Sequence, residues 1–181
     1  MKKISLIIIL IMAIFQMIVL ATAIDIGNVA INRDGYTPYT STLVDIINPA
    51  NASGKITSIE IWAYESMSAI EIATFYVVSG NNLSTRDSVT LGAVTAGSKQ
   101  TFTTDSGGNP ISLNVQTGDY LGTKFTDGQI ERTNGSGGYL YKSGDQIPCT
   151  NETFAASGSG SELSLYGIGV TPNAIMFGMN F

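Results

Sequence analysis

The chain has 181 residues with a formal net charge of −5, and only 13% of the residues are charged. Lysine and arginine together number nine, and the seven that follow residue 3 do not cluster, so the chain lacks the basic stripe with which nucleic-acid binders neutralise phosphates. Histidine is absent and cysteine occurs once, which excludes a Ser-His-Asp triad, a His-ligated zinc site and an intrachain disulfide. This acidic, weakly charged composition favours an extracellular protein.

Residues 1–23 are typical of an export signal. Two lysines follow the first methionine, residues 4–20 are apolar apart from two polar side chains, and residues 21–23 match a small-x-small cleavage site. The alternative is a retained membrane-anchoring helix, because residues 4–24 carry no charge and approach the ~20 residues that cross a bilayer. Either interpretation predicts a secreted or cell-surface protein that meets a membrane only through this segment.

Residues 55–80 predict two long β-strands with a short connection. In the first strand, apolar residues 59, 61 and 63 alternate with Glu60, Trp62 and Tyr64. Successive strand side chains point to opposite faces, so the apolar set predicts a core face. In the second strand, residues 70–78 are apolar almost throughout, which is typical of a strand in mid-sheet or covered on both faces. The pair predicts the centre of an all-β sandwich.

Turn-forming residues divide the rest of the chain into further short strands. Residues 129–132 and 139–142 flank a glycine-rich turn and are expected to form a hairpin. This spacing predicts one sandwich domain over residues 24–170, followed by an apolar tail at 171–181. The other expected strands lie at 24–31, 43–47, 89–94, 100–104, 111–115, 120–125 and 163–168, with loops at 32–42 and 79–87.

Six sequence stretches resemble a family of secreted or virion-associated, jelly-roll-like β-sandwich modules that is seen in environmental sequences. The stretches are NPANASGKITSIEIWA, ATFYVVSGNN, AGSKQTF, VQTGDYLG, SGDQIPCTNETF and SLYGIG, and they span about two-thirds of the chain. The resemblance ends at residue 169. It implies a jelly-roll-like fold and, since no activity is known for the family, no chemistry.

The aromatic residues provide the best candidates for ligand binding. Trp62 and Tyr64 share the strand face of Glu60, and Tyr139 and Tyr141 share one face of the expected hairpin. An open face at Trp62 would offer a flat platform for sugar rings. A lone tryptophan is usually buried, which instead favours a second core layer over this face. Tyr139 and Tyr141 are expected to be exposed.

Carboxylates leave acid–base chemistry on glycosides open, but sequence cannot show whether two of them lie at the required separation. Asp residues beside glycines usually serve the turn itself. The available carboxylates are Glu60, Glu65, Glu71, Asp119, Asp127 and Glu131. A structural calcium would suit the oxygen-rich loop 105–109 or the surroundings of Asp34. Four N-x-[ST] sequons are candidate glycosylation sites: Asn51, Asn82, Asn134 and Asn151.

We expect the protein to be a non-catalytic extracellular subunit with a structural or adhesive role, in a surface appendage, a filament or a virion. Apolar alternation at residues 24–31 and 174–181 suggests that a terminal strand pairs with another copy of the chain. For the tail itself, the simpler and favoured interpretation is a last strand that closes its own sheet. The lone Cys149 is expected to be buried. The alternative functions are a carbohydrate-binding module and a two-carboxylate glycosidase or lyase.

Overall fold

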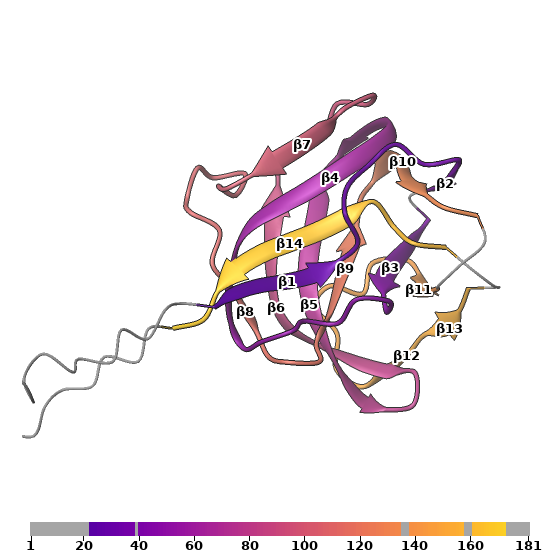
Figure 1. The fold of residues 1–181 in the computed structure, drawn as a ribbon. Helices are drawn as coiled ribbons and strands as arrows, with labels where there is room; N and C mark the ends of the chain where they lie inside the picture. The colour runs from indigo at the N-terminus through magenta and orange to yellow at the C-terminus, as the bar shows by residue number, and fades with distance from the viewer. Residues whose placement is uncertain (1–21, 39, 135–137, 158–160, 173–181) are drawn as a thin grey trace, which may run out of the picture. The chain divides into compact units, whose positions relative to one another are not determined.

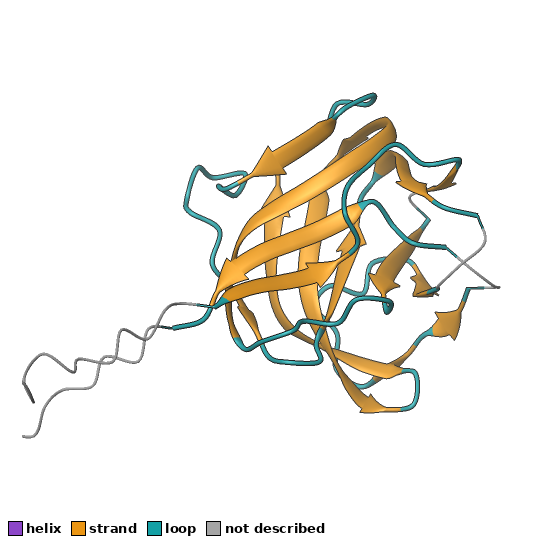
Figure 2. Cartoon of the chain, in the orientation of Figure 1, coloured by secondary structure: helices purple, strands orange, loops and turns teal. Residues whose placement is uncertain are grey.

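The structure, a computed structural model, describes residues 22–38, 40–134, 138–157 and 161–172 (Figure 1). The predicted leader and the apolar tail lie outside these ranges, apart from residues 22, 23, 171 and 172. The described residues form β-strands joined by loops and turns, as Figure 2 shows, and contain no helix. Among them there is therefore no helix that could cross a membrane. The all-β prediction is confirmed.

The first sheet, called sheet 1, is built around the 15-residue strand β4 (Gly54–Ser68). Along one side of β4 lie β14 and then β10, and along its other side lie β8 and β7. All of these pairings are antiparallel. The strands of sheet 1 besides β4 are β1 (Ala23–Gly27), β2 (Gly35–Pro38), β7 (Lys99–Phe102), β8 (Leu113–Val115), β10 (Asp127–Arg132) and β14 (Leu165–Val170).

The second sheet, called sheet 2, is also antiparallel, and its order is β12-β6-β5-β9-β3-β11-β13. Its longest strands, β5 (Ile70–Ser79) and β6 (Asn82–Leu91), form a hairpin. The other members are β3 (Ser41–Asp45), β9 (Tyr120–Lys124), β11 (Tyr139–Ser143), β12 (Glu152–Thr153) and β13 (Ala155–Ala156).

A sharp corner connects the two sheets. Strands β4 and β5 are separated by the single residue Ala69, whose φ of 46° lies in the left-handed region. Asp127 stabilises this corner, because its Oδ1 accepts hydrogen bonds from the Ser68 backbone N (2.8 Å) and the Ser68 hydroxyl (2.6 Å). The predicted pair of long strands is thus confirmed, and its short connection carries the chain from one sheet into the other.

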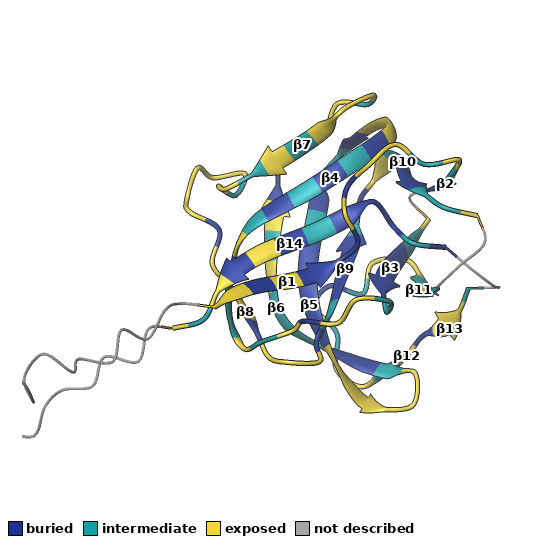
Figure 3. Ribbon diagram, in the orientation of Figure 1, coloured by how far each residue is buried: buried dark blue, intermediate teal, exposed yellow. Residues whose placement is uncertain are grey.

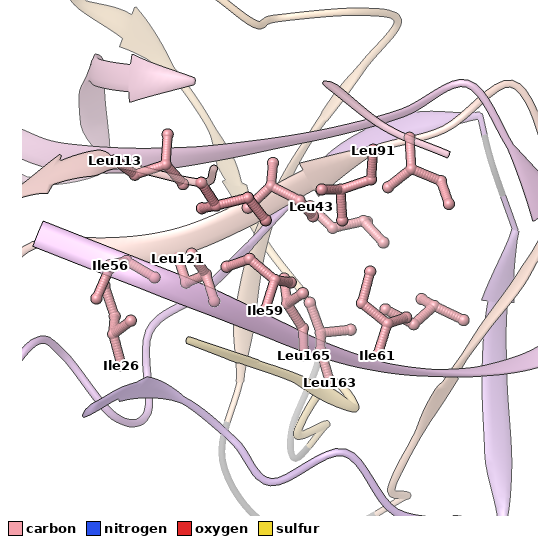
Figure 4. Close-up of a cluster of buried hydrophobic side chains, with 14 of the residues drawn as sticks. Ile26, Leu43, Ile56, Ile59, Ile61, Leu91, Leu113, Leu121, Leu163 and Leu165 are labelled. Atoms are coloured by element: carbon pink, nitrogen blue, oxygen red, sulfur yellow. The ribbon is translucent and has the colours of Figure 1, made fainter. Parts of the chain in front are cut away.

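The main core lies between the sheets. The apolar face of β4 contributes Ile56, Ile59 and Ile61, all fully buried, and Leu121 and Leu43 reach them from sheet 2 (Figure 4). Burial alternates along β4 and β14, as the banding in Figure 3 shows. Each fully buried side chain of this size contributes about 1.5–3 kcal/mol of hydrophobic stabilisation, so this face of β4 makes a substantial contribution to the main core.

A second, smaller core covers the other face of sheet 2. Phe75 of β5 meets Phe154 edge-on with ring centroids 6.0 Å apart, and Leu83, Leu140 and Ile147 complete the cluster. This explains why the start of β5 is apolar on both faces. The interpretation of residues 70–78 as a strand in mid-sheet is confirmed, since β5 lies between β6 and β9. Coverage of both faces holds for residues 70–75, whereas residues 76–78 are exposed. The half-buried Cys149 packs against this cluster, so its expected burial is only partial.

Three sequence predictions are wrong in detail. Strand β2 lies inside the expected loop 32–42, and β6 begins inside the expected loop 79–87. Both stretches are rich in polar and turn-forming residues, which mask strands at the margins of a sheet. The expected hairpin of 129–132 with 139–142 does not form, because β10 pairs in sheet 1 and β11 pairs in sheet 2. The glycine-rich segment therefore joins strands of different sheets.

Gly169 offers a test of the β14–β4 ladder. A Cβ at this position would lie 2.0 Å from the carbonyl oxygen of Lys55, at a shift in the strand register. We expect Gly169→Ala to lower the free energy of unfolding by about 1–3 kcal/mol, because the backbones must separate. Gly92→Ala is the matched control, since a Cβ there meets nothing within 4 Å. Urea unfolding measures both, and equal stability of the two variants would contradict the observed register.

Candidate functional site

The outer face of sheet 1 carries the side chains that alternate with the core residues of β4. Ile59, Ile61 and Ala63 are buried, whereas Glu60 and Trp62 are half-buried and Tyr64 is 49% exposed. The predicted alternation is confirmed. The expected second core layer over Trp62 is wrong, because within the described residues this face meets solvent. Trp62 is shielded within its own sheet, where it lies opposite Lys99 of β7.

Tyr64 does not stand alone on this face. Its ring stacks on that of Tyr36, with centroids 4.6 Å apart and planes inclined by 22°. Tyr36 belongs to β2, two strands away across β10, and is 46% exposed. Sequence reasoning missed Tyr36 because it placed this residue in a loop. The pair forms an exposed aromatic surface beside Trp62, and we call these three residues the aromatic platform.

Polar side chains continue the face beyond Trp62. Glu60 pairs with the Lys99 ammonium at 2.9 Å, and directly opposite Glu60 on β14 lies Tyr166. Burial raises the pKa of the Tyr166 hydroxyl, and the negative charges of Asp25 and Glu60 raise it further. The Tyr166 hydroxyl is therefore close to two carboxylates on the outer face of sheet 1.

A hollow adjoins Tyr166 where the β1–β2 connection passes the start of β14. Its volume is about 400 Å³. The lining is mostly polar and includes Asp25, Asn28, Arg33, Asn48, Glu162 and Tyr166. Because Tyr166 belongs to both features, the hollow and the polar end of the sheet face are continuous. We call it the β1–β14 hollow.

Two buried groups fix the walls of the β1–β14 hollow. The Arg33 side chain, 3% exposed, donates to Glu162 Oε2 (2.7 Å) and Ser164 Oγ (2.8 Å). Asn28 donates to the fully buried Asp45 (2.5 Å) and accepts from Asn48 Nδ2 (2.7 Å). Burial raises the pKa of the Asp45 carboxyl to about 6, although hydrogen bonds from neighbouring N–H groups partly offset this effect.

Tyr139 and Tyr141 form a separate group on β11 of sheet 2. Their rings meet edge-on with centroids 6.4 Å apart, beside a smaller hollow of about 190 Å³ that Thr37 and Pro38 of β2 also line. Tyr141 is 40% exposed, as expected, whereas Tyr139 is half-buried against the main core. The four aromatic residues predicted as ligand contacts thus lie in two places, one on each sheet.

Two of the candidate acid–base carboxylates serve turns. Asp119 is buried, forms a bidentate ion pair with Arg86 and accepts a hydrogen bond from the Gln116 backbone N (2.7 Å). Asp127 holds the corner after Ser68, as described above. Asp119 agrees with the expectation that an Asp beside a glycine supports its own turn, whereas Asp127 instead holds a corner that is 59 residues away in the sequence.

The other candidate carboxylates are dispersed over the two sheets. Glu131 is buried on β10 and accepts a hydrogen bond from the Arg33 backbone N (3.1 Å), and Glu60 is ion-paired. Glu71 lies on β5, where burial and then the charge of Asp145 raise its carboxyl pKa. Glu65 is exposed at the far end of β4. Of these four carboxylates, Glu131 and Glu60 therefore hold neighbouring groups in place.

In the loop 105–109, which is a candidate calcium site by its sequence, the Asp105 carboxylate is engaged in hydrogen bonds within the loop. Asp105 Oδ1 accepts hydrogen bonds from the backbone N atoms of Gly107 and Asn109, both at 2.8 Å, and these interactions lower the pKa of Asp105. Asp34 Oδ1 accepts from the Asn134 backbone N (3.1 Å). Among the described residues, no three His, Cys, Asp or Glu side chains are grouped to hold a metal ion.

The four sequon asparagines all lie in described parts of the chain. The Asn51 amide bonds to Asp25 of β1, and the Asn134 amide contacts Asp34. Asn82 donates to the Asn151 side chain at 3.3 Å, so these two sequons adjoin each other at the end of the β5–β6 hairpin. Glycosylation of these residues stays a prediction.

Asp45 makes the stability of the folded protein depend on pH. Its pKa is about 6 in the folded protein against an ordinary value of 3.8, so the folded protein keeps a proton that the unfolded chain releases. The free energy of unfolding contributed by this group therefore falls as pH rises from about 4 to 6, by about 3 kcal/mol, and is constant above that window. Asp45→Asn cannot titrate and should lack this decline.

Urea unfolding of wild type and Asp45→Asn between pH 4 and pH 7 measures the effect, with the exposed Glu65→Gln as the control for loss of one carboxylate. The free energy of unfolding of the wild type, relative to that of Asp45→Asn, should fall as pH rises through the window. Parallel curves for the two proteins would show that Asp45 titrates normally.

Comparison with known proteins finds no matching family model, no matching curated protein and no matching solved structure. The geometry of the described residues therefore carries the functional argument.

Proposed function

We propose that this protein is a non-catalytic, extracellular adhesive module that binds carbohydrate through the outer face of sheet 1. The observation that carries this proposal is the aromatic platform, in which the exposed, stacked pair Tyr36–Tyr64 lies beside Trp62. The stacked Tyr36 and Tyr64 rings are partly exposed, so the apolar face of a sugar ring can pack on their outward surface while nearby polar groups receive the hydroxyls. Exposed aromatic clusters of this kind mark interaction sites.

The rigidity of the platform supports binding. Tyr64 lies on the longest strand, and Tyr36 is fixed by the antiparallel pairing of β2 with β10. The Arg132 side chain donates to the Tyr36 carbonyl oxygen (2.8 Å), which further holds β2 in place. Because the rings are ordered before a ligand arrives, little conformational entropy is lost on binding.

The polar surroundings favour a neutral ligand. The charge of Glu60 is balanced by Lys99, and the negative charge of Asp25 lies near Tyr166 at the polar end of the same sheet face. A strongly anionic polysaccharide would need clustered cations, and the lysines and arginines of the chain are scattered. We therefore assign neutral polysaccharides as the ligand class.

The remaining features of the proposal are the topology, the location and the absence of catalysis. We infer a jelly-roll-like topology, because the chain crosses between the antiparallel sheets repeatedly, for example from β4 to β5, β8 to β9 and β9 to β10. An extracellular location is supported by the sequence of residues 1–23, whose pattern is typical of an export signal. The absence of catalysis is supported by carboxylates engaged in turns and ion pairs.

Assembly with further copies of the chain is a second candidate role, but strand β1 is a poor donor for it. It pairs with β14 of its own chain, and its other edge is occupied by Asn51, whose amide oxygen accepts from the Asp25 N (3.1 Å). The Gly27 N donates to the Asn48 carbonyl oxygen (2.8 Å). Strand exchange would then depend on residues 174–181, which lie outside the described residues.

Affinity electrophoresis in gels that contain soluble mannan, xylan or β-glucan tests carbohydrate binding. We expect at least one polysaccharide to retard the wild type, and Tyr64→Ala and Trp62→Ala each to weaken the interaction about tenfold, because a stacking surface is removed. Tyr76→Ala is the matched control, since Tyr76 is exposed on sheet 2, away from the platform. Circular dichroism checks that each variant is folded.

Wild-type mobility that none of the polysaccharides changes would contradict the proposal. Equal retardation of the wild type, Tyr64→Ala and Trp62→Ala would place the binding surface elsewhere.

A further inference from the structure

We propose that the β1–β14 hollow is a pocket for one or two rings at the end of a neutral, hydroxyl-rich saccharide. This inference rests on the proposed carbohydrate binding and adds a second subsite to it. The hollow, of about 400 Å³, falls at the small end of the ~300–1,000 Å³ range of ligand pockets. It is therefore sized for a short ligand segment and not for a long chain.

The pocket is built before any ligand arrives. On one wall the Arg33 guanidinium is held by Glu162, Ser164 and the Val29 carbonyl oxygen (3.0 Å). On the other wall Asn28, 4% exposed, is held between Asp45 and Asn48. Buried side chains with fixed hydrogen bonds lose little freedom on binding, which distinguishes this hollow from an incidental surface dent.

The groups left for a ligand are mainly hydrogen-bond acceptors. Within the described residues, no hydrogen bond engages the exposed carboxylate of Asp25 or the hydroxyl of Tyr166. Asn48 uses its Nδ2 to hold Asn28, and its Oδ1 has no partner in the same part of the chain. Acceptors of this kind need a ligand that donates, and adjacent hydroxyls on a sugar ring provide such donors.

The charge of the pocket argues against an acidic ligand. The positive charge of Arg33 is balanced by Glu162 at 2.7 Å, so the net charge that faces the hollow is that of Asp25. A sulfate, phosphate or uronate group would meet this carboxylate without a free cation to compensate. Neutral hexoses fit the donor and acceptor pattern and carry no such penalty.

The position of the pocket links it to the aromatic platform. Tyr166 lines the hollow and lies opposite Glu60, which is two residues from Trp62 on the same strand face. A saccharide whose end occupies the hollow can therefore extend along the outer face of sheet 1 toward Tyr64 and Tyr36. The hollow would select the terminal unit, and the platform would bind the units that follow.

Ligand-observed NMR on the full chain tests the pocket with methyl glycosides of glucose, mannose and galactose, and with glucuronic acid and galactose 6-sulfate as acidic probes. We expect at least one neutral glycoside to bind and the acidic probes to bind at least tenfold more weakly. Asp25→Asn should weaken binding of the neutral glycoside about tenfold, and Tyr166→Phe about threefold, because each removes one ligand contact. Glu65→Gln, which removes an exposed carboxylate elsewhere on β4, should bind like wild type.

Three results would overturn the pocket. These are equal glycoside binding by wild type and Asp25→Asn, stronger binding of the acidic probes, and no binding of any neutral glycoside. A polysaccharide that binds wild type and Asp25→Asn equally and fails to bind Tyr64→Ala would give a different result. That result would reject the pocket, while the proposed function would stand. Failure of every polysaccharide and every glycoside to bind would reject both.

Discussion

The whole structure depends on the burial of one face of a single long strand. Ile56, Ile59 and Ile61 of β4 must be removed from water, and sheet 2 packs over them to do so. Because side chains alternate along a strand, this burial fixes Glu60, Trp62 and Tyr64 on the opposite face. The surface that we assign to ligand binding is thus a direct geometric consequence of the main core.

Local patterns in the sequence predicted what depends on local geometry. The alternation in β4, the apolar start of β5 and the turn role of Asp119 are each encoded within a few residues, and the structure confirms them. The separation of β10 from β11 is not local, because strand partners are chosen by packing across the whole molecule. A glycine-rich connection is equally compatible with a tight hairpin and with a crossing between sheets.

In the candidate site, too, local features could be predicted from the sequence and long-range ones could not. Trp62 and Tyr64 are readable from the alternation of β4, but Tyr36 reaches Tyr64 only through two successive strand pairings across β10. The β1–β14 hollow combines side chains from positions 25 to 166, so no short sequence motif predicts it. Asn28 and Asp45 could have been noticed only as polar residues next to apolar strands, a signal too common to select them.

The pairing of β1 with β14 has a mechanical consequence. Thr22 N donates to Thr171 Oγ1 (2.9 Å) and Thr171 N donates to Thr22 O (3.1 Å), so both ends of the described body emerge at one point. Tension that pulls these ends apart would open the ladder one bond at a time, like a zipper. If both ends are instead fixed to one support, they cannot be pulled apart from each other. A force applied to the outer face of sheet 1 then acts on all the hydrogen bonds between β1 and β14 together.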